Sequence, residues 1–184
     1  MKTTFLLKWV SSRCSNVKFV FKVDDDVFVN PEKLWSTLES SHLYSVMVNI
    51  PDHNNKMVKS NIDYALIGHV MNSVPIRDPS SKWSLPPTFY PLNIFPSFLS
   101  GTAYVLTGSL VPALYHCALR TPFINLEDVF LTGLCASTQL RLKLTHNNVM
   151  FGSLLAPHDH VIFRSLSGGR WQWAALTSVT TRTP

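Results

Sequence analysis

The chain has 184 residues, which is long enough for one domain with a buried core and too short for two ordinary domains. Its net charge of +5 permits anionic ligands, but the lysines and arginines form no run or helical stripe, so we expect no nucleic-acid partner. The stretch from Trp83 to Leu119 has no Asp, Glu, Lys or Arg, yet prolines interrupt it repeatedly, and the sequence therefore does not predict a transmembrane helix there.

The first half of the chain alternates between predicted helices and strands. Apolar residues at helical spacing indicate the first helix, and a proline placed at the first helical position begins the second. In chain order, the predicted elements are a helix at residues 2–12, a strand at 19–23, a helix at 31–39, a strand at 43–50, a polar loop at 51–61 and a strand at 64–71.

The second half opens with a proline-rich irregular segment at residues 74–98, which is long enough to be functional rather than a mere connector. Ser109 and Asn125 are both predicted to cap helices. The elements predicted after the irregular segment are a strand at 102–107, a helix from Ser109 to about residue 119, a helix at 127–140, short strands at 141–145 and 161–165, and a polar end at 177–184. This alternation favours an α/β layered domain, in which ligands bind beyond the carboxyl ends of strands.

Three consecutive aspartates, Asp24, Asp25 and Asp26, directly follow the predicted strand at 19–23. Carboxylates packed at a strand end repel one another, and a divalent metal that then recruits phosphate is the simplest way to stabilise them. Because side chains alternate along a strand, Asp24 and Asp26 share one face and are the expected metal ligands, whereas Asp25 is expected to contact the substrate. The alternative interpretation is a solvated acidic turn.

Glu127 and Asp128 lie in the first turn of a predicted helix, where the helix dipole favours acidic side chains. A purely structural cap is therefore the alternative to a functional role. The three cysteines, Cys14, Cys117 and Cys135, have no zinc-binding spacing, and their pairing stays open.

Four segments of the chain form a recognisable series. They are the aspartate segment at residues 19–30, a Pro-x-Arg…Lys-Trp pattern at 75–83, a Tyr-Pro…Ser-Gly-x-x-Tyr pattern at 90–104 and a Glu-Asp-Val…Gly pattern at 127–133. In this order and spacing they resemble the β-1,3-galactosyltransferases and β-1,3-N-acetylglucosaminyltransferases of glycosyltransferase family 31. The resemblance runs from about Met1 to Trp173.

The resemblance implies a GT-A-like, Rossmann-like α/β fold and an inverting hexosyltransferase. Such an enzyme moves galactose or N-acetylglucosamine from UDP-galactose or UDP-N-acetylglucosamine to a glycan acceptor on a glycoprotein or glycolipid, in β-1,3 linkage. It also implies Mn2+ as cofactor and a type II membrane protein of the Golgi, with its catalytic domain in the lumen. We expect residues 1–173 to be a partial catalytic domain that lacks the first strands of the fold and the N-terminal membrane anchor, and residues 174–184 to be a polar tail.

Asp128 matches the aspartate that acts as the catalytic base in relatives, and Glu127 is expected to contact acceptor hydroxyls or to cap the helix. The other expected substrate-binding residues are Lys22, Arg77, Lys82, Trp83 and Gly101. Structural alternatives exist for them: a charge partner for the aspartates at Lys22, solvated loop charges at Arg77 and Lys82, simple packing at Trp83 and a tight turn at Gly101.

Two departures from the family leave other interpretations open, namely the expected absence of the first strands of the fold and the absence of a histidine at an expected metal position. Relatives often supply a late histidine to the metal, near Phe163, whereas His158 and His160 are displaced from that position by several residues. The chain could therefore be an inactive remnant that binds a glycan or a partner. A phosphotransferase with an aspartate nucleophile is disfavoured, because Phe28 stands where a small hydroxyl residue or valine is expected.

Overall fold

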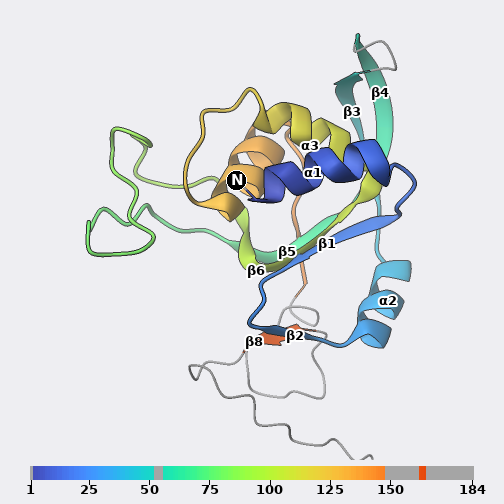
Figure 1. The fold of residues 1–184 in the computed structure, drawn as a ribbon, viewed down its shortest axis with the longest axis horizontal. Coiled ribbons are helices and arrows are strands. Elements are labelled where there is room, and N and C mark those ends of the chain that lie inside the picture. Colours follow the sequence, from blue (N-terminus) through green and yellow to red (C-terminus); the bar gives the residue numbers. More distant parts are fainter. Residues whose placement is uncertain (1, 52–55, 148–161, 165–184) are drawn as a thin grey trace, which may run out of the picture.

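The computed structural model describes residues 2–51, 56–147 and 162–164. Its centre is a four-stranded sheet with the order β1 (Phe19–Val23), β6 (Phe98–Thr107), β5 (Leu66–Met71) and β7 (Thr145–His146). Figure 1 shows β1, β6 and β5 side by side. Strand β6 is antiparallel to both β1 and β5, and β7 is parallel to β5. Strands β1, β5 and β7 therefore share one direction, and their carboxyl ends lie at the same edge of the sheet.

Helices cover both faces of this sheet (Figure 1). Helices α1 (Lys2–Arg13) and α3 (Val111–Ala118) and the π-helical segment η2 (Val129–Gln139) form the larger core with one face. Helix α2 (Pro31–Glu39) packs against the other face and forms a smaller core. The mixed α/β architecture that the sequence predicted is therefore confirmed.

The side chains of strand β6 explain why helices pack against both faces of the sheet. Tyr104 and Leu106 belong to the larger core, whereas Ala103 and Val105 belong to the smaller one. Since successive side chains of a strand point to opposite faces, a strand that is apolar at consecutive positions must be buried on both sides. The mainly apolar sequence of β6 thus accounts for its central place in the sheet.

Two smaller pairs of strands lie outside the sheet. Strands β3 (Tyr44–Pro51) and β4 (Met57–Tyr64) form an antiparallel ribbon, and β2 (Val27–Val29) pairs antiparallel with β8 (Ile162–Arg164). A short 3-10 turn, η1 (Gly108–Leu110), links β6 to α3. In the part of the chain described, no helix is long and apolar enough to cross a membrane.

Most predicted elements are confirmed. The strand at 19–23 and the helix at 31–39 have the predicted bounds, and Asn30 caps the latter by accepting a 3.1 Å bond from the amide of Lys33. Five further elements are found with ends shifted by one to four residues, namely those predicted at 2–12, 43–50, 64–71, 102–107 and 161–165. The irregular segment at 74–98 also holds, up to the start of β6.

The predicted polar loop at 51–61 is wrong, because residues 57–61 belong to β4 and residue 51 belongs to β3. Lys59, Asn61 and Asp63 are exposed along this strand, while Ile62 and Tyr64 face inward. A two-stranded ribbon with one solvent-exposed face carries many polar residues, so its sequence resembles that of a loop. Residues 52–55, between β3 and β4 in the chain, lie outside the described residues.

Both predicted caps in the second half are also wrong. Ser109 lies in η1, where its hydroxyl donates a 2.6 Å bond to the carbonyl of Asp63, and α3 begins two residues later at Val111. Asp128, not Asn125, is the N-cap of η2. In place of the strand predicted at 141–145, β7 contains only Thr145 and His146. The His158 and His160 positions and the polar tail lie outside the described residues.

Candidate active site

The three aspartates lie at the carboxyl edge of the sheet, where β1 ends beside the first half of β6. The amide of Asp24 donates a 3.0 Å bond to the carbonyl of Thr102, so the pairing with β6 continues one residue past β1. Asp24 and Asp26 are half-buried, whereas Asp25 is exposed. Exposure thus alternates along the triple in the way that strand geometry predicts.

Lys22 connects the aspartates to the start of the helical segment. Its ammonium is 2.5 Å from Oδ1 of Asp24 and also donates to the carbonyl of Gly101. It lies 3.9 Å from Oε2 of Glu127. The charge partner for the aspartates that the sequence suggested at Lys22 is therefore present.

Asp128 is held by two backbone amides. Its Oδ2 accepts a 3.0 Å bond from the amide of Gly101, and its Oδ1 accepts a 2.8 Å bond from the amide of Val129. A methyl group on Gly101 would lie only 3.1 Å from Oδ2 of Asp128, so glycine lets β6 approach this carboxylate. Both oxygens are thus fixed in position by main-chain groups.

Thr132, one turn further along η2, also links η2 to β6. Its hydroxyl donates a 2.7 Å bond to the carbonyl of Asp128 and accepts a 2.8 Å bond from the amide of Leu99. Thr132 is buried, so these bonds are shielded from water. The backbone of Asp128 is therefore as firmly placed against β6 as its side chain.

Glu127 lies against the sheet rather than in solvent. Its Oε1 accepts a 2.6 Å bond from the hydroxyl of the buried Tyr104. Burial raises the pKa of Glu127, while the bond from Tyr104 and the nearby Lys22 act in the opposite direction. Burial, followed by the charge of Glu127, raises the pKa of Tyr104 well above its ordinary value.

Register explains why Lys22 and Tyr104 reach the same carboxylate. The two residues are direct partners in the antiparallel pairing of β1 and β6, so their side chains leave the same face of the sheet. Glu127 lies over that face and contacts both. Lys22, Tyr104, Glu127 and Asp24 thus form one polar cluster, which we call the sheet-edge cluster.

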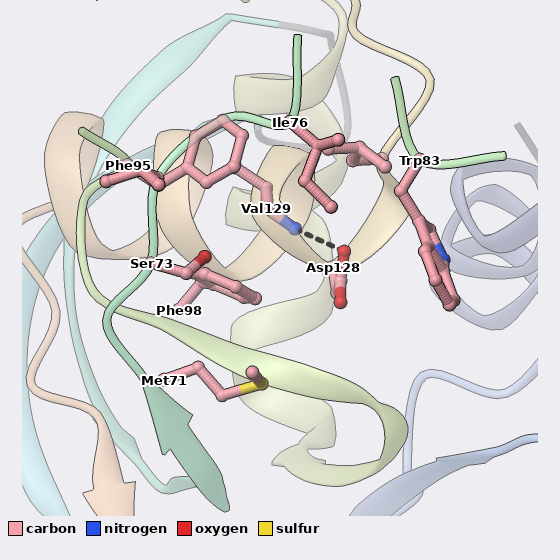
Figure 2. A pocket seen from close by; sticks show the side chains of 10 residues that line it. Met71, Ser73, Ile76, Trp83, Phe95, Phe98, Asp128 and Val129 are labelled. Carbon is pink, nitrogen blue, oxygen red and sulfur yellow. Dashed lines mark hydrogen bonds between the residues drawn. The ribbon is translucent and has the colours of Figure 1, made fainter. Parts of the chain in front are cut away.

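A pocket of about 170 Å³ opens on the side of Asp128 (Figure 2). Its walls are mostly apolar and include Met71, Phe98 and Trp83, and Asp128 is the one charged residue among those that line it. Trp83 remains 54% exposed, so its ring is available to a ligand. Figure 2 shows the Asp128 carboxylate and the Trp83 ring at this pocket.

The remaining predicted residues lie on the irregular segment. The guanidinium of Arg77 donates to the carbonyls of Leu85 and Leu92, at 2.5 and 2.7 Å, and so braces this segment. The ammonium of Lys82 lies 4.3 Å from the centre of the Trp83 ring. The structure thus brings Lys22, Asp24, Gly101, Glu127 and Asp128 together, with Trp83 at the adjoining pocket.

The acidic triple fits a hard dication in the chemistry of its donors, because carboxylate oxygens are the ligands that manganese prefers. Within residues 2–51, 56–147 and 162–164, however, no group of three or more Asp, Glu, His or Cys side chains is placed to hold a metal ion. The described residues could therefore supply only part of a coordination shell.

Sequence reasoning assigned no role to Tyr104 or Thr132. A tyrosine inside an otherwise apolar strand was the available signal for Tyr104, since a buried phenol requires a polar partner. For Thr132 no comparable signal exists, because threonine is common at many positions of helices.

Comparison with known proteins gives consistent matches. The family model of the galactosyltransferases matches residues 1–148. β-1,3-galactosyltransferase 1 of Mus musculus and of Homo sapiens is 35% identical over 135 residues, which cover 73% of this chain and 36% of the relative. β-1,3-galactosyltransferase 5 of Homo sapiens is 32% identical over 153 residues, covering 82% of this chain and 43% of the relative. The chain thus spans less than half the length of these relatives.

Proposed function

The chain belongs to the galactosyltransferase family, and we propose that residues 1–173 contribute to the GT-A-type catalytic domain of an inverting β-1,3-galactosyltransferase. The reaction moves galactose from UDP-galactose to a hydroxyl of a glycan on a glycoprotein or glycolipid. The names of the relatives favour galactose over N-acetylglucosamine as the transferred sugar. One observation carries the proposal: Asp128 is fixed between two amides, beside an apolar pocket and next to the sheet-edge cluster.

Asp128 is the proposed general base. An acceptor hydroxyl is a weak nucleophile, and a carboxylate within hydrogen-bond reach must take its proton as the new glycosidic bond forms. Each oxygen of Asp128 accepts one backbone bond and keeps further acceptor capacity for that hydroxyl. The Trp83 ring offers an apolar surface for one face of the acceptor sugar.

The acidic triple is the proposed donor side of the site. Asp24 and Asp26 would hold Mn2+, and Asp25 would contact the ribose or sugar of the donor. When bound, the metal neutralises the charge that develops on the departing diphosphate. Lys22 orients Asp24 through their 2.5 Å contact. Lys82, whose ammonium lies beside the Trp83 ring, is a proposed phosphate contact.

We place the whole protein in the Golgi, attached to the membrane by an N-terminal anchor, with this domain in the lumen. That setting supplies nucleotide sugars and glycan acceptors together.

Glu127, held by Tyr104, is the proposed contact for a second acceptor hydroxyl.

A chimera tests the proposal. Residues 1–148 would replace the matching segment of human β-1,3-galactosyltransferase 1, and galactose transfer from UDP-galactose would be measured. We expect transfer in the presence of Mn2+, and a loss of roughly 10²- to 10⁴-fold in kcat for Asp128→Asn, because a general base contributes that much. UDP affinity, measured by calorimetry, should be unchanged in this variant.

Glu39→Gln is the matched control, because Glu39 is an exposed carboxylate at the end of α2. It should transfer galactose like the unmodified chimera. If Asp128→Asn retains transfer, the base assignment fails. If the folded, unmodified chimera transfers nothing, the proposed function itself fails.

A glycan-binding module without transferase activity is the second candidate. The ion pair between Lys22 and Asp24 favours it, because it neutralises one expected metal ligand within the protein. Binding of a galactose- or N-acetylglucosamine-terminated oligosaccharide at Trp83, together with no heat from Mn2+ and UDP, would select this alternative.

A further inference from the structure

Cys117 and Cys135 meet where the end of α3 packs against η2. The Cys117 sulfur lies 3.7 Å from the carbonyl oxygen of Cys135. Both sulfurs contact the hydroxyl of Thr121, at 3.7 Å from Cys117 and 3.5 Å from Cys135. The two thiols thus share one polar partner inside the larger core.

Access to this pair is one-sided. Cys117 is half-buried, whereas Cys135 is buried. A dissolved reagent therefore reaches Cys117 more readily than Cys135.

The two thiols also differ in acidity. A hydrogen bond between the two thiols is the main cause that lowers the pKa of Cys117 to about 7, and the same bond, followed by burial, raises the pKa of Cys135. Since the thiolate is the attacking species in disulfide exchange, Cys117 is suited to react near neutral pH.

We propose that Cys117 and Cys135 form an intramolecular disulfide when the chain meets a low-molecular-weight disulfide oxidant such as oxidised glutathione. The Cys117 thiolate attacks one sulfur of the oxidant, forms a mixed disulfide and releases one thiolate. The Cys135 thiol then loses its proton and attacks the Cys117 sulfur, releasing the second thiolate. The protein thiols give up two electrons, and the oxidant is reduced to two thiols.

The disulfide would enclose the segment that carries Glu127 and Asp128. Between α3, which ends at Ala118, and the first helical turn at Glu127, this segment has no helix or strand of its own. A covalent link between its flanks restricts the unfolded chain and holds the segment to α3. This inference goes beyond the proposed function and does not depend on it.

Peptide mapping tests the link directly. Trypsin places the three cysteines in three different peptides, namely residues 14–18, 83–120 and 121–141. The purified chain would be equilibrated with oxidised and reduced glutathione, quenched with acid, alkylated and digested. We expect peptide 83–120 linked to peptide 121–141 in both the unmodified chain and Cys14→Ser, and we expect Cys14 of the unmodified chain to be alkylated.

A thermal measurement provides the second readout. Oxidation should raise the Tm of the unmodified chain and of Cys14→Ser by roughly 5–10 °C, and should leave that of Cys117→Ser unchanged. A dominant link through Cys14, or a glutathione adduct on Cys117 with Cys135 still free, would overturn the proposal. So would a cross-link that forms without any rise in Tm.

Discussion

Asp128 shows how a residue with a structural role is also placed for a proposed chemical one. Its side chain caps η2 through the amide of Val129 and also accepts the amide of Gly101 from β6. The sequence presented these roles as alternatives, a helix cap or a base. In the structure the cap fixes the orientation of the carboxylate, so the structural role is compatible with the proposed chemical one.

Gly101→Ala tests the approach of β6 to this carboxylate. The added methyl carbon would lie 3.1 Å from Oδ2 and 3.3 Å from Cγ of Asp128, which is closer than ordinary packing. We expect a loss of about 1 kcal/mol in the free energy of unfolding, because crowding in a packed site is destabilising. Urea denaturation would measure it, and the chimera's kcat should fall as well.

Ser100→Ala is the control for Gly101→Ala, since it changes the neighbouring residue of the same strand without adding bulk near Asp128. It removes the 3.2 Å bond between the hydroxyls of Ser100 and Thr102, so its stability can fall slightly, but it should keep the kcat of the parent. Equal behaviour of Gly101→Ala and the parent would show that Asp128 does not depend on this close approach.

Glu127 gives a pH prediction. Burial raises its pKa above the ordinary value of 4.5, so the folded state binds its proton more tightly than the unfolded state does. The stability that comes from this proton is present below about pH 4.5 and is lost as the pH rises through the folded-state pKa. Glu127→Gln keeps an acceptor for Tyr104 and cannot ionise.

Urea titrations between pH 4 and 8 would compare the two proteins. Relative to Glu127→Gln, the unmodified chain should lose stability as the pH rises through this window. A difference that stays constant, or that grows in favour of the unmodified chain at higher pH, would contradict the burial of Glu127.

At the scale of elements, the junction between β1 and β6 depends on a glycine that the sequence did not single out. The amide of Gly108 donates a 3.0 Å bond to the carbonyl of Lys18, and a methyl group on Gly108 would collide with the carbonyl oxygen of Val17. The two backbones therefore meet without room for a side chain.

Gly108→Ala should cost about 3 kcal/mol or more, because a rigid backbone oxygen cannot move aside as a flexible side chain can. Chemical denaturation would measure this loss. Ser109→Ala, at the next and exposed position, should cost no more than about 1 kcal/mol, the net worth of one hydrogen bond. Similar stabilities of the two variants would refute the steric explanation.

The accuracy of sequence prediction varied between elements for physical reasons. Strand β1 and helix α2 were predicted to the residue, because an apolar run and a proline start are local signals. The sequence of strand β4 resembles that of a loop because one face of the strand is exposed to solvent. Strands β2 and β7 are too short to have a pattern and exist only through their partners.

At the scale of the whole molecule, the site is assembled from segments far apart in the chain. Lys22 and Tyr104 meet through strand pairing, and Glu127 joins them from the helical segment. The sequence identified most of these residues through motifs, but it could not show the register that brings them together. The pocket beside Asp128 could not be predicted from the sequence either, because its walls come from four separate segments.

The central claim is that the acidic triple and Asp128 belong to one site. Its most direct test is paramagnetic broadening of amide signals in the NMR spectrum when Mn2+ and UDP are added to the purified chain. The account predicts that the amides of Gly101 and Val129 broaden, that diamagnetic Mg2+ has no such effect, and that Asp26→Asn abolishes the broadening. Sharp Gly101 and Val129 signals while Mn2+ binds elsewhere, or broadening that survives in Asp26→Asn, would contradict it.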